Sequence, residues 1–120
     1  MTIRLLTQSD AEPLEAFLVQ HRDSSMFLRS NAQRGGLDFQ GRVEQAEYVA
    51  AFQSGAIVAV AAHSWSGMIL VQAPEQLEAV VRGCVAESGR KVSGFSGPLE
   101  QVRRARAALQ HPEMPCHGLV

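Results

Sequence analysis

The chain is poor in the features that mark several protein classes. Its 120 residues include only two cysteines, and eleven basic and twelve acidic residues leave a net charge of −1. Two cysteines make no disulfide framework, and a balanced charge gives no reason to expect nucleic acid or an anionic membrane. No apolar run approaches the ~20 residues that span a bilayer, and the N-terminus lacks the apolar segment of a signal peptide. These absences predict a cytoplasmic protein without nucleic-acid or membrane partners.

Apolar residues are well represented, at 46% of the chain, and the length suits one domain with one core. Three consecutive strands are predicted in the centre of the chain, at residues 47–52, 56–63 and 68–72. The first two contain continuous apolar runs, which are typical of strands covered on both faces. The rest of the chain is therefore expected to pack around these strands.

Helical patterns flank the central strands. The elements predicted before them are a strand at 2–6, a helix that starts around 7–10 and ends near 22–23, and a helix at about 25–34 that Gly35 and Gly36 terminate. Those predicted after them are a helix at 74–88, a strand at 90–95 and a helix that opens at Gly97 and Pro98. The predicted fold class is α/β, with a mixed, mostly antiparallel five-stranded sheet flanked by helices in the order β-α-α-β-β-β-α-β-α. Residues 1–110 are expected to form one domain, and residues 111–120 a flexible tail.

Individual side chains make the helix predictions more specific. Ser9 and Glu12 have the spacing of a capping box, with Asp10 as the alternative cap. Pro74 suits the first position of its helix. The apolar residues predicted to face the core are Leu77, Val80, Val81, Cys84 and Val85 in that helix, and Leu99, Val102, Ala105 and Leu109 in the last one.

Three groups of residues could carry chemistry. The turn at 93–98 could hold an anion, with Ser96 as a donor and Gly97 allowing close approach; the alternative is a glycine-capped helix start. His63 beside Ser64 suggests a base next to a hydroxyl, but neighbours in a strand point to opposite faces, so nucleophilic catalysis is not expected. No metal site is expected in the tail, because His111, Cys116 and His117 fit no standard zinc spacing.

Several segments, in their order and spacing, resemble a known family. They are FLRSN at 27–31 followed by GGL at 35–37, YVAAF at 48–52, LVQAPE at 70–75, and Gly97-Pro98 followed by Gln101-Val102. Together they resemble the N-terminal domain of one subgroup of the GNAT N-acetyltransferases, in which a second, C-terminal GNAT domain follows. The resemblance covers nearly all of residues 3–109.

This resemblance implies the first part of the GNAT fold, with acetyl-coenzyme A (acetyl-CoA) as the family's cofactor. In such folds the first two helices border the cleft for the acceptor substrate. Arg29 and Asn31 on the second helix could therefore line that cleft, although helix packing and capping explain them about as well. Trp65, at a turn, could line a ligand cleft or cap the core.

The resemblance also exposes a departure from the family pattern. A working GNAT domain places a Q/R-x-x-G-x-G/A loop after the fourth strand, whose N–H groups hold the coenzyme pyrophosphate. Here residues 72–77 read QAPEQL, so Gln72 aligns with the first position but neither glycine is present. Pro74 removes an N–H donor, and Glu75 and Glu78 place negative charge where the phosphates would lie. We therefore expect this coenzyme site to be absent or degenerate.

Three functional hypotheses follow. In the first, the chain is the N-terminal domain of a GNAT-type acetyltransferase, inert alone, and it contributes substrate-cleft or interface surface to a C-terminal catalytic GNAT domain. The absence of both motif glycines from residues 72–77 favours this hypothesis. In the second, the chain is a small stand-alone N-acetyltransferase that uses acetyl-CoA. In the third, it is a non-enzymatic module that forms a homodimer.

Overall fold

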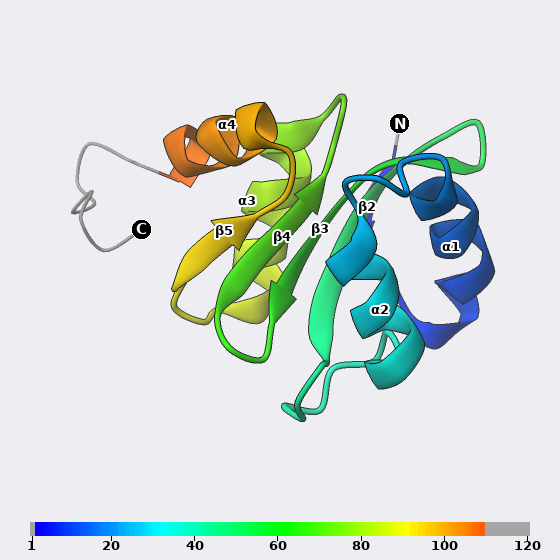
Figure 1. Cartoon of the computed structure of the whole chain (residues 1–120), viewed down its shortest axis with the longest axis horizontal. Coiled ribbons are helices and arrows are strands. Elements are labelled where there is room, and N and C mark those ends of the chain that lie inside the picture. The colour runs from blue at the N-terminus through cyan, green and yellow to red at the C-terminus, as the bar shows by residue number, and fades with distance from the viewer. Residues whose placement is uncertain (1, 110–120) are drawn as a thin grey trace.

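The central sheet has five strands, and a computed structural model describes residues 2–109 around it (Figure 1). The strands are β1 (Thr2–Leu5), β2 (Ala46–Gln53), β3 (Ala56–Ser64), β4 (Met68–Gln72) and β5 (Gly94–Ser96). The helices are α1 (Ala11–Val19), α2 (Met26–Gly35), α3 (Leu77–Ser88) and α4 (Leu99–Leu109), and a 3-10 turn, η1 (Gln8–Asp10), precedes α1.

The strands lie side by side in chain order from β1 to β5. Strands β1 to β4 pair antiparallel, and β5 runs parallel to β4, so the sheet is mixed and mostly antiparallel. The predicted α/β class and the five-stranded mixed sheet flanked by helices are confirmed. Two expectations, a flexible tail and no metal site in that tail, fall on residues 110–120, outside the described residues.

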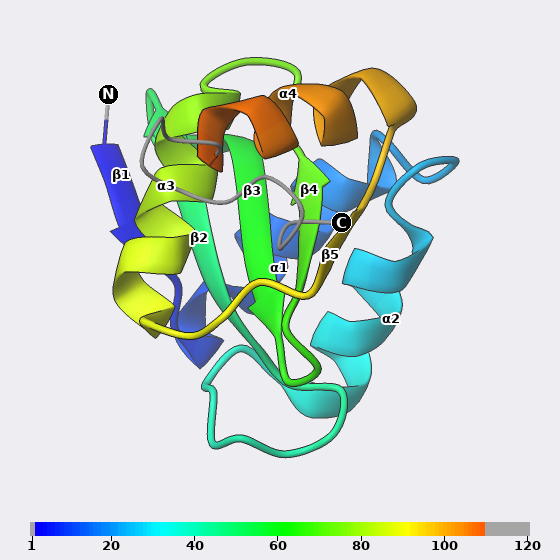
Figure 2. The same ribbon diagram turned by 90° about the vertical axis from the view of Figure 1, so that its left-hand side faces the viewer.

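Each face of the sheet is covered by a pair of helices, α1 with α2 on one side and α3 with α4 on the other (Figures 1 and 2). Successive side chains of a strand point to opposite faces. In β2, Tyr48 and Ala50 therefore pack under α1 and α2, while Val49 and Ala51 pack under α3 and α4. The continuously apolar runs are thus covered on both faces, as predicted.

The start of α1 differs from the prediction. The Asp10 carboxylate accepts a hydrogen bond from the Thr7 N–H at 2.8 Å and receives both guanidinium nitrogens of Arg4 at 2.9 Å. The Arg4 guanidinium, with help from the Thr7 N–H, lowers the pKa of Asp10 to about 2. The Ser9 and Glu12 capping box is therefore wrong, since the hydroxyl of Ser9 lies against that of Thr7 instead. The alternative, Asp10, does stand at the N-cap position of α1, but its carboxylate bonds Thr7 and Arg4 and makes no capping bond to α1. The first helix also ends at Val19, earlier than residues 22–23.

Three predictions after β4 are also wrong, two in the boundaries of an element and one in the direction of a side chain. The third helix begins at Leu77 rather than Pro74, because Gln76 adopts a left-handed conformation (φ +55°) just before it. Strand β5 covers only Gly94–Ser96, and the carbonyl oxygen of Lys91 before it bonds to the His63 side chain rather than to a neighbouring strand. Leu99 is 66% exposed rather than inward, because it begins α4 at the surface. The predicted inward face of α3 is confirmed at four of its five positions, Leu77, Val80, Val81 and Cys84, which are buried.

The core contains a buried hydroxyl group, that of Tyr48, which a single substitution would remove. Tyr48 is fully buried under α1 and α2, and its hydroxyl has no hydrogen-bond partner among the described residues. Burial raises the pKa of this phenol. A buried polar group without a partner costs roughly 1–3 kcal/mol.

We expect Tyr48→Phe to leave the free energy of unfolding unchanged or to raise it by ~1 kcal/mol, because the ring stays and the hydroxyl goes. Urea denaturation followed by circular dichroism measures this. The matched control Tyr48→Ala should lower the free energy of unfolding by roughly 3–5 kcal/mol, because it removes the ring. A loss of more than about 1 kcal/mol in Tyr48→Phe would show that the hydroxyl is hydrogen-bonded.

Candidate functional site

A pocket of about 230 Å³ lies where α2, the β3–β4 turn and the last two strands meet. Its apolar lining consists of Phe27, Trp65, Met68 and Leu70. Its polar lining consists of Asn31, Ser64, Ser66 and Ser96. The pocket therefore combines an apolar floor and wall with amide and hydroxyl groups.

The local structure explains why these side chains meet. Phe27 and Asn31 are four residues apart on α2, which places them on one helix face. Met68 and Leu70 alternate along β4 and so share one sheet face, and Ser96 of β5 lies directly beside Leu70. The β3–β4 turn brings the remaining side chains to the same place.

The turn is held by its own hydroxyl groups. Ser64 Oγ lies 3.0 Å from Ser66 Oγ and accepts a hydrogen bond from the Met68 N–H at 3.1 Å. None of the eight lining side chains is a carboxylate, an amine, an imidazole or a thiol. The pocket can therefore hydrogen-bond and bury an uncharged group, but its lining supplies no general base or acid at neutral pH.

Three of the candidate cofactor- or substrate-binding residues predicted from the sequence come together in this pocket: Asn31, Trp65 and Ser96. Arg29 lies elsewhere, because its guanidinium binds the Glu15 carboxylate with a closest distance of 2.6 Å and so links α2 to α1. Phe27, Met68 and Leu70 were not singled out, since nothing in an apolar residue's identity separates a pocket wall from the core.

The remaining two candidates, Gln72 and Gly97, meet near the end of β4. Gln72 is the last residue of that strand, and Gly97 lies in the turn between β5 and α4. Gln72 is buried, and its side-chain oxygen accepts a hydrogen bond from Ser24 Oγ at 2.8 Å. Gly97 has φ +149°, and a Cβ placed there would be 2.5 Å from the backbone oxygen of Val71. The turn between β5 and α4 therefore packs directly against the end of β4.

A side chain of α4, that of Gln101, contacts the backbone just after the end of β4. The Ala73 N–H donates a hydrogen bond to Gln101 Oε1 at 2.7 Å. Ala73 is the first residue after Gln72, and Pro74 follows it without an N–H. Two consecutive residues at the start of the β4–α3 connection thus have no free N–H to offer a ligand.

A buried polar cluster lies on the other side of β3, where the sequence showed no pattern. His63 Nδ1 is 2.6 Å from Ser88 Oγ, and its Nε2 is 3.1 and 3.0 Å from the carbonyl oxygens of Gly67 and Lys91. Two carbonyl acceptors require the hydrogen on Nε2, so Nδ1 accepts from the Ser88 hydroxyl. Ser64 faces the pocket instead, which agrees with the expectation that His63 and Ser64 do not pair. The partners lie 25 and 28 residues from His63 in the sequence, so no local motif could reveal them.

Arg90 completes this cluster. Its guanidinium donates to the carbonyl oxygens of His63 at 2.8 Å and Ser64 at 2.9 Å, and it binds the Glu47 carboxylate at 2.7 Å. The same group lies over the Phe39 ring at 4.4 Å from its centre. Burial, and then the positive charge of Arg90, lower the pKa of His63. The cluster joins β2 and β3 to the segment that leads into β5.

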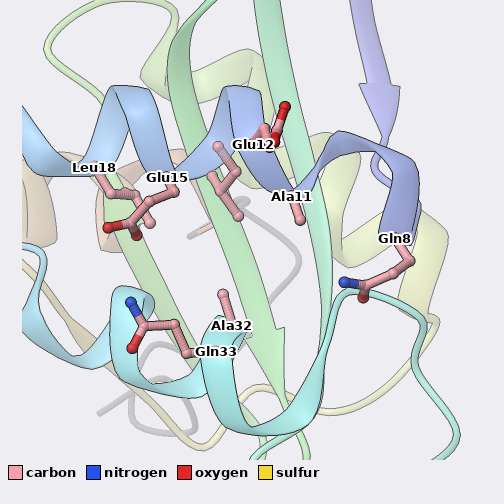
Figure 3. Close-up of a pocket in the computed structure, with 8 residues that line it drawn as sticks. Gln8, Ala11, Glu12, Glu15, Leu18, Ala32 and Gln33 are labelled. Carbon is pink, nitrogen blue, oxygen red and sulfur yellow. The ribbon is translucent and has the colours of Figure 1, made fainter.

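A second cavity, of about 250 Å³, lies between α1 and α2 (Figure 3). Its apolar lining is Ala11, Leu14, Leu18 and Ala32, and its polar rim is Gln8, Glu12, Glu15 and Gln33. Two of the rim groups are already engaged, since Gln8 accepts from the Leu37 N–H at 2.8 Å and Glu15 binds Arg29. None of the candidate cofactor- or substrate-binding residues predicted from the sequence lines this cavity, so we treat it as a packing groove between helices.

Comparisons with models of protein families, with curated proteins and with solved structures found no match to this chain. Among residues 2–109, no helix has the length and apolar character needed to cross a bilayer. The described part of the chain also brings together no group of three His, Cys, Asp or Glu residues that could hold a metal ion. The pocket and the β4–α3 connection are therefore the features of this chain that bear on its function.

The close approach at Gly97 can be tested with a matched pair of variants. We expect Gly97→Ala to lower the free energy of unfolding by more than about 2 kcal/mol, because the added Cβ meets the Val71 backbone at a strained φ. Gly55→Ala is the control, since its φ is +82° but no atom lies within 4 Å of the added Cβ, and it should cost only ~1 kcal/mol. Equal losses in the two variants would show that the β5–α4 turn does not lie against the Val71 backbone.

The His63 cluster predicts a pH dependence of stability. A folded pKa below the ordinary value of about 6.5 means that folding favours neutral His63. The resulting stability is fully present above pH ~6.5 and is lost as the pH falls below it. We expect chemical denaturation to give a lower free energy of unfolding at pH 5.5 than at pH 7.5.

In His63→Gln this difference should shrink, while His21→Gln, a histidine outside the cluster, should keep it. Asp10, with its pKa of about 2, does not titrate in this range. An unchanged pH dependence in His63→Gln would contradict the assignment to His63.

Proposed function

We propose that this chain is a non-catalytic accessory domain of the GNAT acetyltransferase type. In this role it contributes binding surface to a catalytic GNAT domain and does not bind acetyl-CoA itself. Support comes from the element order β-α-α-β-β-β-α-β-α around a sheet in chain order, together with the resemblance of segments 27–31, 48–52, 70–75 and 97–102 to the front domain of a tandem enzyme.

The observation that carries the proposal is the state of the β4–α3 connection. In a GNAT domain this connection would hold the coenzyme pyrophosphate with backbone N–H groups. Here the Ala73 N–H is bonded to Gln101, and Pro74 has none. The exposed carboxylates of Glu75 and Glu78 stand at the start of α3, where they would repel phosphate. The first two donor positions of the connection are therefore closed, and the charge of the two carboxylates opposes a bound phosphate.

The chemistry of the pocket supports the same role. Its eight lining residues offer hydroxyl, amide and apolar groups but no side chain that could take a proton from an amine. A domain that bound both partners of an acetyl transfer would need such a group near the acceptor. The pocket instead suits the recognition of an uncharged group.

Calorimetric titration of the purified chain with acetyl-CoA tests the proposal. We expect no binding heat up to millimolar coenzyme, because the first two positions of the connection after β4 offer no free N–H and the connection carries negative charge. Circular dichroism of the same sample establishes that the chain is folded. Binding at micromolar concentration would overturn the proposal and would favour a small stand-alone N-acetyltransferase.

A further inference from the structure

The two edges of the sheet differ in how they are protected. Edge strands are commonly guarded by charged side chains, which discourage pairing with another strand. At one edge, β1 carries Arg4, whose guanidinium binds Asp10 and lies over the Phe52 ring at 4.4 Å from its centre. At the other edge, β5 consists of Gly94, Phe95 and Ser96 and carries no charge. Among residues 2–109 no strand pairs with the outer side of β5.

Large apolar side chains surround this unguarded edge. Figure 2 looks onto β5, with α4 above it and α2 beside it. Phe27 of α2 is 65% exposed, Leu99 at the start of α4 is 66% exposed, and Trp65 of the β3–β4 turn is 37% exposed. Phe27 and Trp65 also line the pocket, and so does Ser96 of β5 itself. The free edge and the pocket are therefore parts of one surface.

The size and charge of the pocket restrict what can enter it. Its volume of about 230 Å³ is below the roughly 300–1,000 Å³ of sites that enclose whole small ligands. It is comparable to one large side chain. A charged group would lose its hydration there without gaining a partner of opposite charge, which is strongly unfavourable. The pocket thus favours a single uncharged, mainly apolar side chain.

We infer that β5 and the adjoining pocket bind an extended segment of a partner protein. The segment pairs its backbone with the free edge of β5 and places one uncharged apolar side chain in the pocket beside Phe27 and Trp65. Side chains of an added strand alternate between faces, so only those on the α2 side can reach the pocket. This inference rests on the proposed accessory role, because that role requires a protein partner. The partner's segment must carry one uncharged apolar side chain.

The test uses ¹⁵N-labelled chain and blocked five-residue peptides. The probe is Ac-TVFVT-NH2, and the matched control is Ac-TVKVT-NH2, which puts a charge at the central position. Because Trp65 is the only tryptophan, its indole signal reports on the pocket, and the amides of Gly94, Phe95 and Ser96 report on the edge. We expect Ac-TVFVT-NH2 at millimolar concentration to shift both sets of signals, and Ac-TVKVT-NH2 to bind at least tenfold more weakly.

Two exposed neighbours on α2 provide matched variants. Phe27 lines the pocket and Met26, at 67% exposure, does not. Phe27→Asp should weaken binding of Ac-TVFVT-NH2 at least tenfold, and Met26→Asp should leave it within twofold. Equal effects of the two variants, or no shift with any peptide, would overturn the inference.

Other occupants are separate outcomes of the same experiment. Shifts of the Trp65 indole by phenylacetamide that equal those by the peptide, with no change at β5, would make the pocket a small-molecule site and overturn the inference. Concentration-dependent shifts without peptide, with a dimer in sedimentation, would assign the surface to a second copy and also overturn it. Acetyl-CoA is titrated separately, so its binding would refute the proposed function without altering the peptide result.

Discussion

The contact between α4 and the end of β4 is the constraint on which the functional part of the structure depends. Gly97 is the residue that lets the β5–α4 turn lie against the Val71 backbone, where any Cβ would clash. That placement brings Gln101 onto the Ala73 N–H. It also ends β5 at Ser96, so that the hydroxyl of this residue lines the pocket. The close approach of Gly97 to Val71 thus places Gln101 on the Ala73 N–H and Ser96 in the lining of the pocket.

A second set of interactions fixes how β5 enters the sheet. Arg90 binds Glu47 of β2 and two carbonyl oxygens at the end of β3, and His63 bonds to the carbonyl oxygen of Lys91. The carbonyl oxygen of Lys91 is thus bonded to a side chain of β3, and regular pairing with β4 begins only at Gly94. On this side of the sheet Arg90 and Glu47 are engaged in structure, while the pocket on the other side has an uncharged lining. This contrast fits the proposal that the domain recognises a partner without transferring a proton.

Much of the fold could be predicted from local sequence. The three central strands were placed to within one residue at each end, because apolar runs and glycine turns are local signals. One error falls where a distant side chain takes part in the local structure, as Arg4 does for Asp10. Another falls where the backbone leaves the expected conformation, as Gln76 does before α3. The pocket was only partly predictable. Polar or aromatic residues at turns and helix faces could be singled out one by one, but their meeting depends on the parallel pairing of β4 with β5.

The central claim is that the start of the β4–α3 connection is already bonded within the domain. The most direct test is the hydrogen-exchange rate of the Ala73 amide, measured by NMR with and without acetyl-CoA. The account predicts slow exchange, because this N–H donates to Gln101 Oε1 at 2.7 Å, and an unchanged rate at millimolar coenzyme. Exchange as fast as that of an unprotected amide, or slowing on addition of acetyl-CoA, would contradict it.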